Sequence, residues 1–321
     1  MGQTWIKSED NVADDPTRHK ELRPREFVSQ DIQDLVDGTG DVSSCSVGTL
    51  AQSHPALATR MQAPSHGVSH ARVCLEVYGG CGRLTAALLK RGLPCRDPLE
   101  AFPKPKVYRA EHDMNDRSVV KKLLAEASLG LFSFIHFGIP CSWWSNLARI
   151  NGSSRRIHCP DGRGALLPGE TQSEQQASDM ADILIRHHRR GGLFTIENPL
   201  FSLLFLSKHF KRLASAVPLC EAHVDQCSYG LKLPGASAHC FCQKRTKFVA
   251  NFESICELTR ACPGRGPNHH HEHAIGSRVV VSNLGKSQRV SLAKAAGRYP
   301  LSLCQGLAGI VDRELCRRDH V

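Results

Sequence analysis

The sequence predicts an α/β fold, in which a mostly parallel, Rossmann-like sheet is flanked by helices and followed by a small irregular C-terminal region. Short apolar runs have the length and composition of buried strands, at 72–78, 131–138 and 193–199. Segments with helical character lie between them, at 85–92, 118–127 and 173–192. Strands that alternate with helices favour parallel pairing, because each helix returns the chain to the same edge of the sheet.

The first strand and the longest helix have clear ends. The strand RVCLEVY at 72–78 runs into the glycine-rich turn GGCGR. In the helix at 173–192, Met180, Ile183 and Leu184 fall at helical spacing, and two glycines at its end suit a helix stop. Both observations agree with an alternation of strands and helices.

Beyond residue 220 this alternation weakens. HVDQCSYG and KRTKFVAN predict strands, which we expect to pair antiparallel, and SLAKAAGRYPLSLCQGLAGIVDREL predicts helix with a break at Pro300. We expect one folded domain at 71–310 with a short recognition-like insert at about 251–285, between a polar leader or linker at 1–70 and a polar tail at 311–321.

Composition narrows the classes of protein. The chain has 321 residues, 41% of them hydrophobic, so it can bury a substantial core. Its formal net charge of +10 favours a polyanionic partner, nucleic acid first. No apolar run has the length of a membrane span, and the N-terminus lacks the apolar core of a signal peptide. We therefore expect a nuclear or cytoplasmic protein that is not secreted, with its 14 cysteines mostly reduced.

The turn after the first strand has the features of a ligand-binding loop. Gly79, Gly80 and Gly82 lack side chains, so a ligand can approach their backbone closely. In doubly wound sheets the first such turn is where nucleotide-like ligands bind. The acidic residue Glu76 precedes the glycines, which differs from the dinucleotide-binding pattern. The alternative is a structural turn with solvated acids.

This order of an acidic residue and then clustered glycines resembles the S-adenosylmethionine motif of class I methyltransferases. The resemblance implies that S-adenosylmethionine is the cofactor and that Glu76 lies near its methionine amino group. It also implies that Glu100 reaches the ribose hydroxyls and that Asp113 meets the adenine amine.

A cysteine follows the strand at 131–138. Pro140 and Cys141 lie in the stretch GIPCSWWS, just outside the carboxyl end of that strand, where open parallel sheets carry their catalytic residues. A thiolate there can act as a nucleophile, particularly if a following helix N-terminus lowers its pKa. The alternative for a lone cysteine is a buried structural thiol.

The segments around and after Cys141 resemble, in order, those of the DNA cytosine-5 methyltransferases. A Pro-Cys pair is followed by a loop, by DGRGAL at 161–166 where the family has Asp-x-Arg-x-x-Leu, and by a helix. Glu-Asn-Pro at 197–199 then stands where the family has Glu-Asn-Val. QKRTK at 243–247 is similar to the family's Gln-x-Arg-x-Arg, with Lys247 in place of the last arginine. The resemblance covers about residues 71 to 310.

The resemblance implies a reaction through a cysteine adduct on a base flipped out of DNA. Cys141 would add to C6 of cytosine, which makes C5 able to take a methyl group. Glu197 would hold a proton toward the ring N3, while Arg245 and Arg163 steady the base and its backbone. Pro140 would border the cofactor. The implied nucleic-acid contacts are Arg155, Arg156, Gln243 and Lys247, and a solvated basic face is the alternative for the loop arginines.

The cysteines and histidines near the C-terminus invite a zinc interpretation. They are Cys240, Cys242, Cys256, Cys262 and the run at 269–273. Their spacing does not match a C-x-x-C with H-x-x-x-H finger. We therefore predict no metal site and interpret the stretch as a polar loop that reaches nucleic acid or binds metal adventitiously.

Residues 4–18 resemble the closing residues of the ribonuclease H region in retroelement polyproteins. This resemblance implies an origin in a DIRS-type retrotransposon, with the tail of that region inside 1–70.

Three alternatives to DNA cytosine methylation remain open at this point. An RNA cytosine methyltransferase would use the same domain. An adenine N6 methyltransferase would need an Asp or Asn before its prolines, which GIPC lacks. An inactive, retroelement-derived remnant would bind nucleic acid through its basic surface alone.

Overall fold

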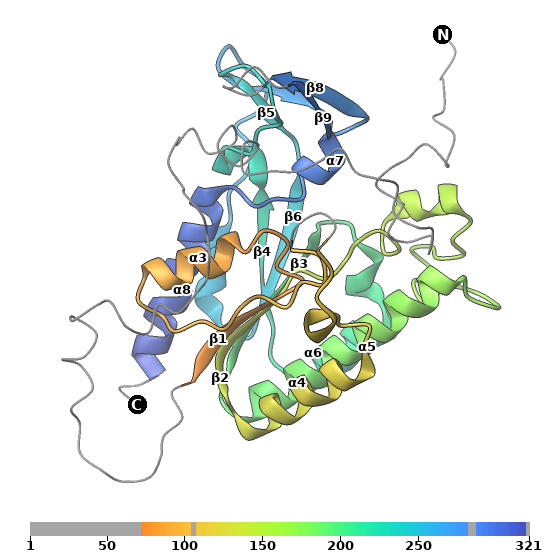
Figure 1. Ribbon diagram of the computed structural model, residues 1–321, viewed down its shortest axis with the longest axis vertical. Helices are drawn as coiled ribbons and strands as arrows, with labels where there is room; N and C mark the ends of the chain where they lie inside the picture. The colour runs from red at the N-terminus through yellow and green to blue at the C-terminus, as the bar shows by residue number, and fades with distance from the viewer. Residues whose placement is uncertain (1–71, 104–106, 282–286, 319–321) are drawn as a thin grey trace.

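The computed structural model describes residues 72–103, 107–281 and 287–318 (Figure 1). The polar leader expected at 1–70 and its retroelement resemblance lie outside these residues. The described residues form an α/β structure around one five-stranded sheet with the order β1-β2-β3-β6-β4. Its strands are β1 (Val73–Val77), β2 (Phe132–Phe137), β3 (Leu193–Pro199), β4 (Cys220–Asp225) and β6 (Arg245–Ala250).

The sheet is mixed, which corrects the expectation of a mostly parallel one. β2 pairs in parallel with both β1 and β3, whereas β6 pairs antiparallel with both β3 and β4. The parallel strands are joined through helices. Between β4 and β6 the chain makes only the single turn η6 (Gln226–Tyr229) and the short strand β5 (Cys240–Cys242). Without a crossover helix the chain comes back in the opposite direction. The expected antiparallel pairing is confirmed, but of the strand expected at 223–230 only the part up to Asp225 belongs to β4, and η6 follows it.

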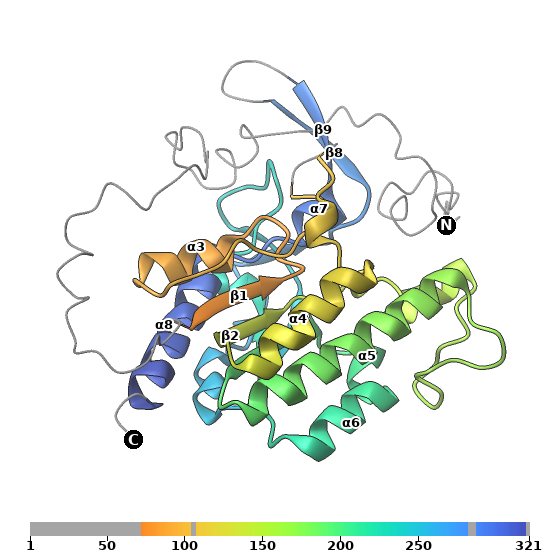
Figure 2. The same ribbon diagram turned by 60° about the horizontal axis from the view of Figure 1, so that its bottom comes forward.

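Helices cover both faces of the sheet (Figures 1 and 2). One face carries α3 (Arg83–Lys90) and α8 (Leu301–Arg318), and the other carries α4 (Arg117–Leu129), α5 (Pro168–Arg189) and α6 (Lys208–Ala216). The remaining short helices are η3 (Ala110–His112), η4 (Asn146–Asn151), η5 (Leu203–Leu206), η7 (Glu253–Leu258) and α7 (Leu292–Ala295). Two small two-stranded sheets complete the described chain. In one, β5 pairs with β7 (His270–Glu272), and in the other β8 (Ser277–Val281) pairs with β9 (Ser287–Ser291).

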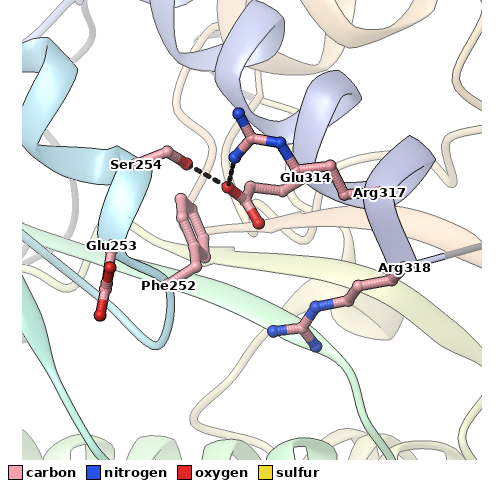
Figure 3. Close-up of a pocket in the computed structure, with 6 residues that line it drawn as sticks. All are labelled: Phe252, Glu253, Ser254, Glu314, Arg317 and Arg318. Atoms are coloured by element: carbon pink, nitrogen blue, oxygen red, sulfur yellow. Dashed lines mark hydrogen bonds and ion pairs between the residues drawn. The ribbon is translucent and has the colours of Figure 1, made fainter. Parts of the chain in front are cut away.

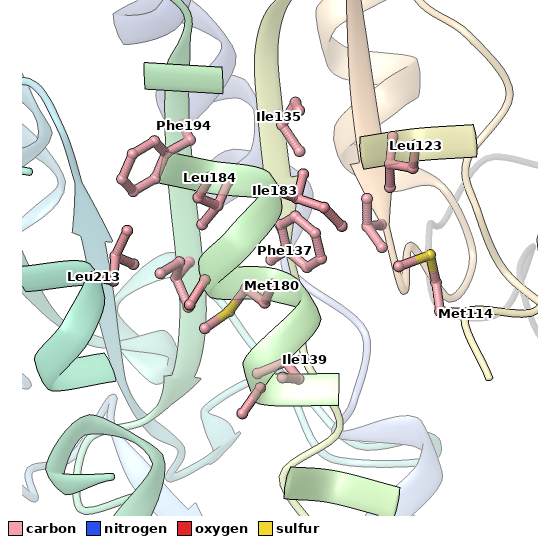
Figure 4. Close-up of a cluster of buried hydrophobic side chains, with 14 of the residues drawn as sticks. Met114, Leu123, Ile135, Phe137, Ile139, Met180, Ile183, Leu184, Phe194 and Leu213 are labelled. Carbon is pink, nitrogen blue, oxygen red and sulfur yellow. The ribbon is translucent and has the colours of Figure 1, made fainter. Parts of the chain in front are cut away.

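The apolar stripe of α5 packs on the sheet as its spacing predicts. Met180, Ile183 and Leu184 are fully buried and face Ile135 of β2 and Phe194 of β3 (Figure 4). Each buried side chain of this kind contributes about 1.5–3 kcal/mol relative to an exposed one. This packing fixes the direction of β2 and β3, and with it the position of the segments that follow them.

The C-terminal region belongs to the core rather than to a tail. The polar tail expected from residue 311 is, as far as Arg318, a continuation of α8. Val311 is fully buried, because the apolar face of the helix continues past 310. The expected insert also starts inside the core, where Ile255 and Leu258 of η7 are buried. Among the described helices, none is long and apolar enough to span a bilayer.

Candidate functional site

The segments that follow three strands of the sheet, or end them, lie at the same edge. β1 leads into the glycine turn at 78–82, β2 into 138–141, and β3 ends at Glu197–Pro199 in the same direction. On its outer side β1 makes parallel bridges to Cys95 and Leu99. The chain therefore leaves β1 on one side and later enters β2 on the other, which makes this edge a topological switch point. Ligands of open α/β sheets bind at such points.

The glycine turn has a backbone that few side chains would allow. Gly80 and Gly82 have φ values of +56° and +67°, and Tyr78 holds a left-handed φ of +59° although it has a side chain. A Cβ on Gly79 would lie 2.8 Å from Cβ of Pro98. Around Gly80 a Cβ would meet nothing within 4 Å, so the backbone there faces open space.

Glu76 lies beneath this turn and is 2% exposed. Its Oε2 accepts hydrogen bonds from the backbone N–H of Thr85 (2.9 Å) and from the Thr85 hydroxyl (2.7 Å). Helix α3 has no side-chain cap from Gly82, so this carboxylate satisfies one of its free N–H groups. Burial raises the pKa of Glu76 to about 7, although the bonds from Thr85 oppose that rise.

The other two predicted cofactor carboxylates lie at the same edge. Glu100 accepts from the N–H of Gly80 (3.0 Å), so it borders the glycine turn directly. Asp113 follows η3 and accepts from the hydroxyl of Tyr108 (2.9 Å). Burial raises the pKa of Tyr78, and the negative charges of Asp179, Asp113 and Glu100 raise it further.

Cys141 is exposed and stands at the end of a loop that is tied to the sheet. The side-chain amide of Asn198, in β3, donates to the carbonyl of Ile139 (2.8 Å), which fixes the segment carrying Pro140 and Cys141. Desolvation by the surrounding protein raises the pKa of the Cys141 thiol, Lys244 lowers it, and Glu197 raises it. The thiol thus lies within electrostatic reach of both charged groups.

Glu197 is 7% exposed and is only partly satisfied. Its Oε2 accepts from the hydroxyl of Tyr299 (3.0 Å). Its Oε1 has no hydrogen-bond partner among the described residues, and Nζ of Lys244 lies 3.6 Å away. Buried carboxylate oxygens are normally bonded, so a partner such as a base donor would complete this one.

A chain of hydrogen bonds supports Glu197 from behind. Nδ1 of His136 lies 2.7 Å from the Thr195 hydroxyl, and its Nε2 lies 3.2 Å from the Tyr299 hydroxyl. Burial lowers the pKa of His136 to about 3, so the ring is neutral. If Tyr299 donates to Glu197, the Nε2–H of His136 donates to Tyr299 and its Nδ1 accepts from Thr195. The orientation of the Glu197 carboxylate is thereby fixed.

Neither Lys244 nor Tyr299 was predicted from the sequence as a residue of the site. On β6 neighbouring side chains alternate between faces, and Phe248 pairs with Glu197. Lys244 therefore points to the face of Glu197, whereas Arg245 and Lys247 point to the other. Strand alternation within QKRTK is the signal that would have picked out Lys244. For Tyr299 the one feature visible in the sequence is its position directly before Pro300, which is a weak indication.

Arg245 and Lys247 have partners on that other face. Arg245 Nε donates to Oδ1 of Asp225 (3.1 Å), and its guanidinium lies 5.6 Å from the Phe201 ring centroid. Lys247 pairs with Glu221. The structure therefore does not bring Arg245 to Glu197 as the resemblance implied, and Gln243 is exposed just before this strand.

The nucleic-acid role predicted for Arg155 is wrong. Its side chain is buried, lies 3.6 Å from the ring centroid of Trp144, and donates to the carbonyl of Glu170 (3.1 Å) and to Oε1 of Glu174 (3.2 Å). A guanidinium held in this way cannot reach a phosphate. The loop arginine instead anchors the loop onto the start of α5.

The neighbouring arginines differ from Arg155. Arg156 is half-buried and donates to the backbone carbonyls of Ser153 (2.8 Å) and Arg155 (2.6 Å). Arg163 is exposed, and its backbone N–H donates to the Ser154 hydroxyl (3.0 Å). Of the predicted loop contacts, Arg163 is the one with an accessible side chain.

A surface hollow elsewhere on the molecule has no part in this arrangement. Figure 3 shows it at the end of α8, where the hydroxyl of Ser254 and the guanidinium of Arg317 both donate to Glu314. Its residue Phe252 follows the end of β6 that lies away from Cys141. The hollow therefore lies at the opposite end of the sheet from the predicted site.

Comparison with known proteins gives similarity to solved structures, and that similarity is distant. No protein-family model and no curated protein matches the sequence. The structure is similar to the Dnmt2 methyltransferase of S. pombe, with a TM-score of 0.34, 11% identity and coverage of 61% of this chain and 57% of that one. A mutant of Spodoptera frugiperda DNMT2 gives a TM-score of 0.29 and 13% identity, over 63% of this chain and 55% of that one. The chain thus spans little more than half the length of either, and function has to be argued from the site itself.

Proposed function

We propose that the protein transfers a methyl group from S-adenosylmethionine to C5 of cytosine in DNA, through an adduct on Cys141. The observation that carries the proposal is the meeting of an exposed thiol with an incompletely bonded, buried Glu197 and with Lys244, at a switch point of the sheet. A strained residue beside them supports a ligand site, since left-handed backbone at a side-chain-bearing residue such as Tyr78 is costly.

The residues of the glycine turn fit the cofactor. Bare backbone at Gly80 faces open space, so a ligand can approach it closely. Glu76 and Glu100 place two carboxylates beneath and beside the turn, and these suit an ammonium group and ribose hydroxyls respectively. The bound cofactor supplies a methyl group on a positively charged sulfur.

The reaction would then proceed through the side chains of Cys141 and Glu197. The Cys141 thiolate forms a bond to C6 of the flipped cytosine, and electron density moves to C5. The electron-rich C5 would then accept the methyl group that S-adenosylmethionine, held at the glycine turn, would supply. A base removes the C5 proton, the S–C6 bond breaks, and the Cys141 thiolate is restored. Glu197, oriented by Tyr299, holds a proton toward N3 throughout.

Lys244 has two effects in this scheme. Burial raises the pKa of Cys141 overall, and the Lys244 ammonium opposes that rise, which increases the share of reactive thiolate. The ammonium also lies 3.6 Å from Glu197 Oε1, where it offsets the negative charge of the carboxylate.

Covalent trapping tests the proposal. The full chain is incubated with S-adenosylmethionine and an oligonucleotide carrying 5-fluorocytosine, which has no removable proton at C5 and therefore holds the adduct. We expect a band shifted by the mass of the oligonucleotide on a denaturing gel. The shift should vanish in Cys141→Ser and persist in Cys316→Ser, an exposed cysteine on α8.

The substrate is tested in the same experiment with DNA and RNA oligonucleotides of one sequence. An adduct on DNA supports the proposal, and an adduct on RNA alone would mean that RNA is the substrate. Absence of any adduct, with S-adenosylmethionine binding measurable by calorimetry, would overturn the cysteine mechanism. Absence of both adduct and cofactor binding would leave only a nucleic-acid-binding remnant.

A further inference from the structure

We propose that Cys227, Cys262, His269 and His271 together bind one zinc ion. Each of the four offers one ligand atom, and these atoms all lie within 4.8 Å of one another. None of them has a part in the proposed methyl transfer, so this site stands independently of it.

The distances from Cys262 to the two histidines are those of a tetrahedral site. Sγ of Cys262 lies 3.5 Å from Nε2 of His269 and 3.3 Å from Nε2 of His271, and the two Nε2 atoms are 2.9 Å apart. With metal bonds of about 2.3 Å to sulfur and about 2.0 Å to nitrogen, tetrahedral geometry separates such ligand atoms by about 3.3–3.8 Å. Small shifts of two histidine rings would therefore admit the ion.

The fold brings distant parts of the chain to this point. Cys227 lies in η6, directly after β4, and is 2% exposed. The segment with Cys262 is held beside it, because the N–H of Cys262 donates to Oδ2 of Asp225 (2.8 Å). His271 lies on β7 and His269 directly precedes this strand, so the two side chains, two positions apart in the chain, point to the same side.

The surroundings of the cluster also resemble those of a structural metal site. The N–H of Gly264 donates to Sγ of Cys262 (3.3 Å), a bond that stabilises a thiolate. The ring of Phe241 stacks on that of His269 with centroids 4.6 Å apart, which fixes the ring plane. Neighbouring groups of this kind orient metal ligands and limit the access of water.

The ligand set indicates zinc and a closed site. Two thiolates and two imidazoles suit zinc rather than magnesium or calcium, which prefer oxygen ligands. Four protein ligands leave no open position for chemistry. The ion would thus hold the end of β4 to the segment before β8. Asp225, which contacts both Cys262 and Arg245, joins this region to the edge of the sheet.

The prediction of no metal site rested on spacing along the chain, which hides one of the four proposed ligands. Cys227 lies far upstream of Cys262 and was not among the cysteines considered. Cys240, Cys242 and Cys256, which were considered, lie outside the four, and Cys242 is buried in a small apolar cluster instead.

Metal content of the full chain, purified without a histidine tag, tests the proposal. We expect one zinc per chain by inductively coupled plasma mass spectrometry after gel filtration. Replacement by cobalt should give the visible spectrum of a tetrahedral ion with thiolate charge-transfer bands. Cys262→Ser should lose the stoichiometric metal, whereas Cys256→Ser, a nearby cysteine outside the cluster, should keep it.

The histidine run itself could bind metal at the surface, and two results separate this from the proposed site. The double change His270→Ala and His273→Ala should leave the metal and its spectrum intact. If that variant loses the metal, or if the cobalt spectrum of the unchanged chain lacks thiolate bands, the proposal is wrong. A disulfide between Cys227 and Cys262, found by mass spectrometry in metal-free protein that takes up no zinc after reduction, would also overturn it.

Discussion

Two buried carboxylates in this protein differ in how completely their oxygens are hydrogen-bonded. Glu170, at the start of α5, is 0% exposed; its Oε1 accepts from Ser153 (2.7 Å) and Ser154 (3.1 Å), and its Oε2 accepts from the N–H of Leu167 (2.9 Å). Glu197 is buried to a similar degree but leaves Oε1 without a hydrogen-bond partner among the described residues.

The difference separates a structural role from a binding role. A carboxylate whose two oxygens are both bonded within the protein stabilises a loop and needs no further partner. A buried oxygen without such a bond costs free energy unless something completes it. Glu170 and Glu197 therefore make a matched pair for testing where the chemistry lies.

The largest effect is expected for Glu197→Gln. The side chain keeps its shape and its bond from Tyr299 but loses the ability to hold a proton at N3. We expect methyl transfer to fall by roughly 10²–10⁴-fold, measured with labelled S-adenosylmethionine and DNA. The loss of negative charge should also lower the pKa of Cys141, since Glu197 raises it. Alkylation of Cys141 by iodoacetamide near neutral pH should therefore speed up.

Glu170→Gln is the control for that change. It removes charge-assisted bonds at 153, 154 and 167, so the free energy of unfolding should fall by about 1–3 kcal/mol, with adduct formation retained in the folded fraction. Equal loss of transfer in both variants, without faster alkylation in Glu197→Gln, would erase the distinction between the two carboxylates.

A second effect is expected at Arg155, a buried residue that donates to the carbonyl of Glu170 and pairs with Glu174. Arg155→Leu removes its ion pair with Glu174 and should lower the free energy of unfolding by about 3 kcal/mol, measured by chemical denaturation. Because the side chain is buried, the salt dependence of DNA binding should not change. Arg163→Ala should show the opposite pattern. Its free energy of unfolding should change by less than about 0.5 kcal/mol, whereas the slope of the logarithm of the DNA-binding constant against the logarithm of the salt concentration should become shallower by about one. A reduced slope in folded Arg155→Leu would contradict the assignment.

The smallest effect concerns pH and Glu76, a third buried carboxylate. Because burial raises its pKa to about 7, the folded chain binds a proton more tightly than the unfolded one. The stability that this proton confers is complete below pH 4.5 and is lost as pH rises through 7, by up to about 1.4 kcal/mol per pH unit. Ionised Glu76 is the form that would bind the cofactor ammonium, so affinity should rise roughly tenfold from pH 6 to 8.

Calorimetric titration and thermal melts across that pH range measure both trends. Glu76→Gln should flatten both and weaken binding at pH 8. An affinity for S-adenosylmethionine that rises equally in Glu76→Gln would mean that another group is responsible.

Elements with strong local patterns could be predicted from the sequence. The apolar runs gave β1, β2 and β3 within a residue or two, and the spacing of Met180, Ile183 and Leu184 gave the buried face of α5. The helical pattern at 291–315 indicated α7 and most of α8, which ends at Arg318. The tail expected from residue 311 is part of α8, because Val311 continues the buried face of this helix among charged residues.

The candidate site was predictable where a residue lies at, or just beyond, the carboxyl end of a strand. Cys141, Glu197 and the glycine turn meet that condition, and the parallel strands bring them to one edge. Which way a polar side chain points was much harder to predict. A basic loop predicts phosphate contacts, yet Arg155 lies on Trp144, because a buried acidic helix start competes for the same guanidinium. Ligand clusters assembled from distant segments, such as Cys227 with Cys262, leave no local pattern at all.

Tyr299 links the site to the order in which the chain is synthesised. Its hydroxyl contacts His136, which lies 163 positions earlier, and Glu197, which lies 102 positions earlier. A growing chain can form β1, β2 and β3 long before this residue leaves the ribosome, and contacts over such separations form late in folding. Until then Glu197 lacks the donor that fixes its orientation. A product cut short before residue 299 would therefore carry the thiol and the carboxylate without the geometry that makes them act together.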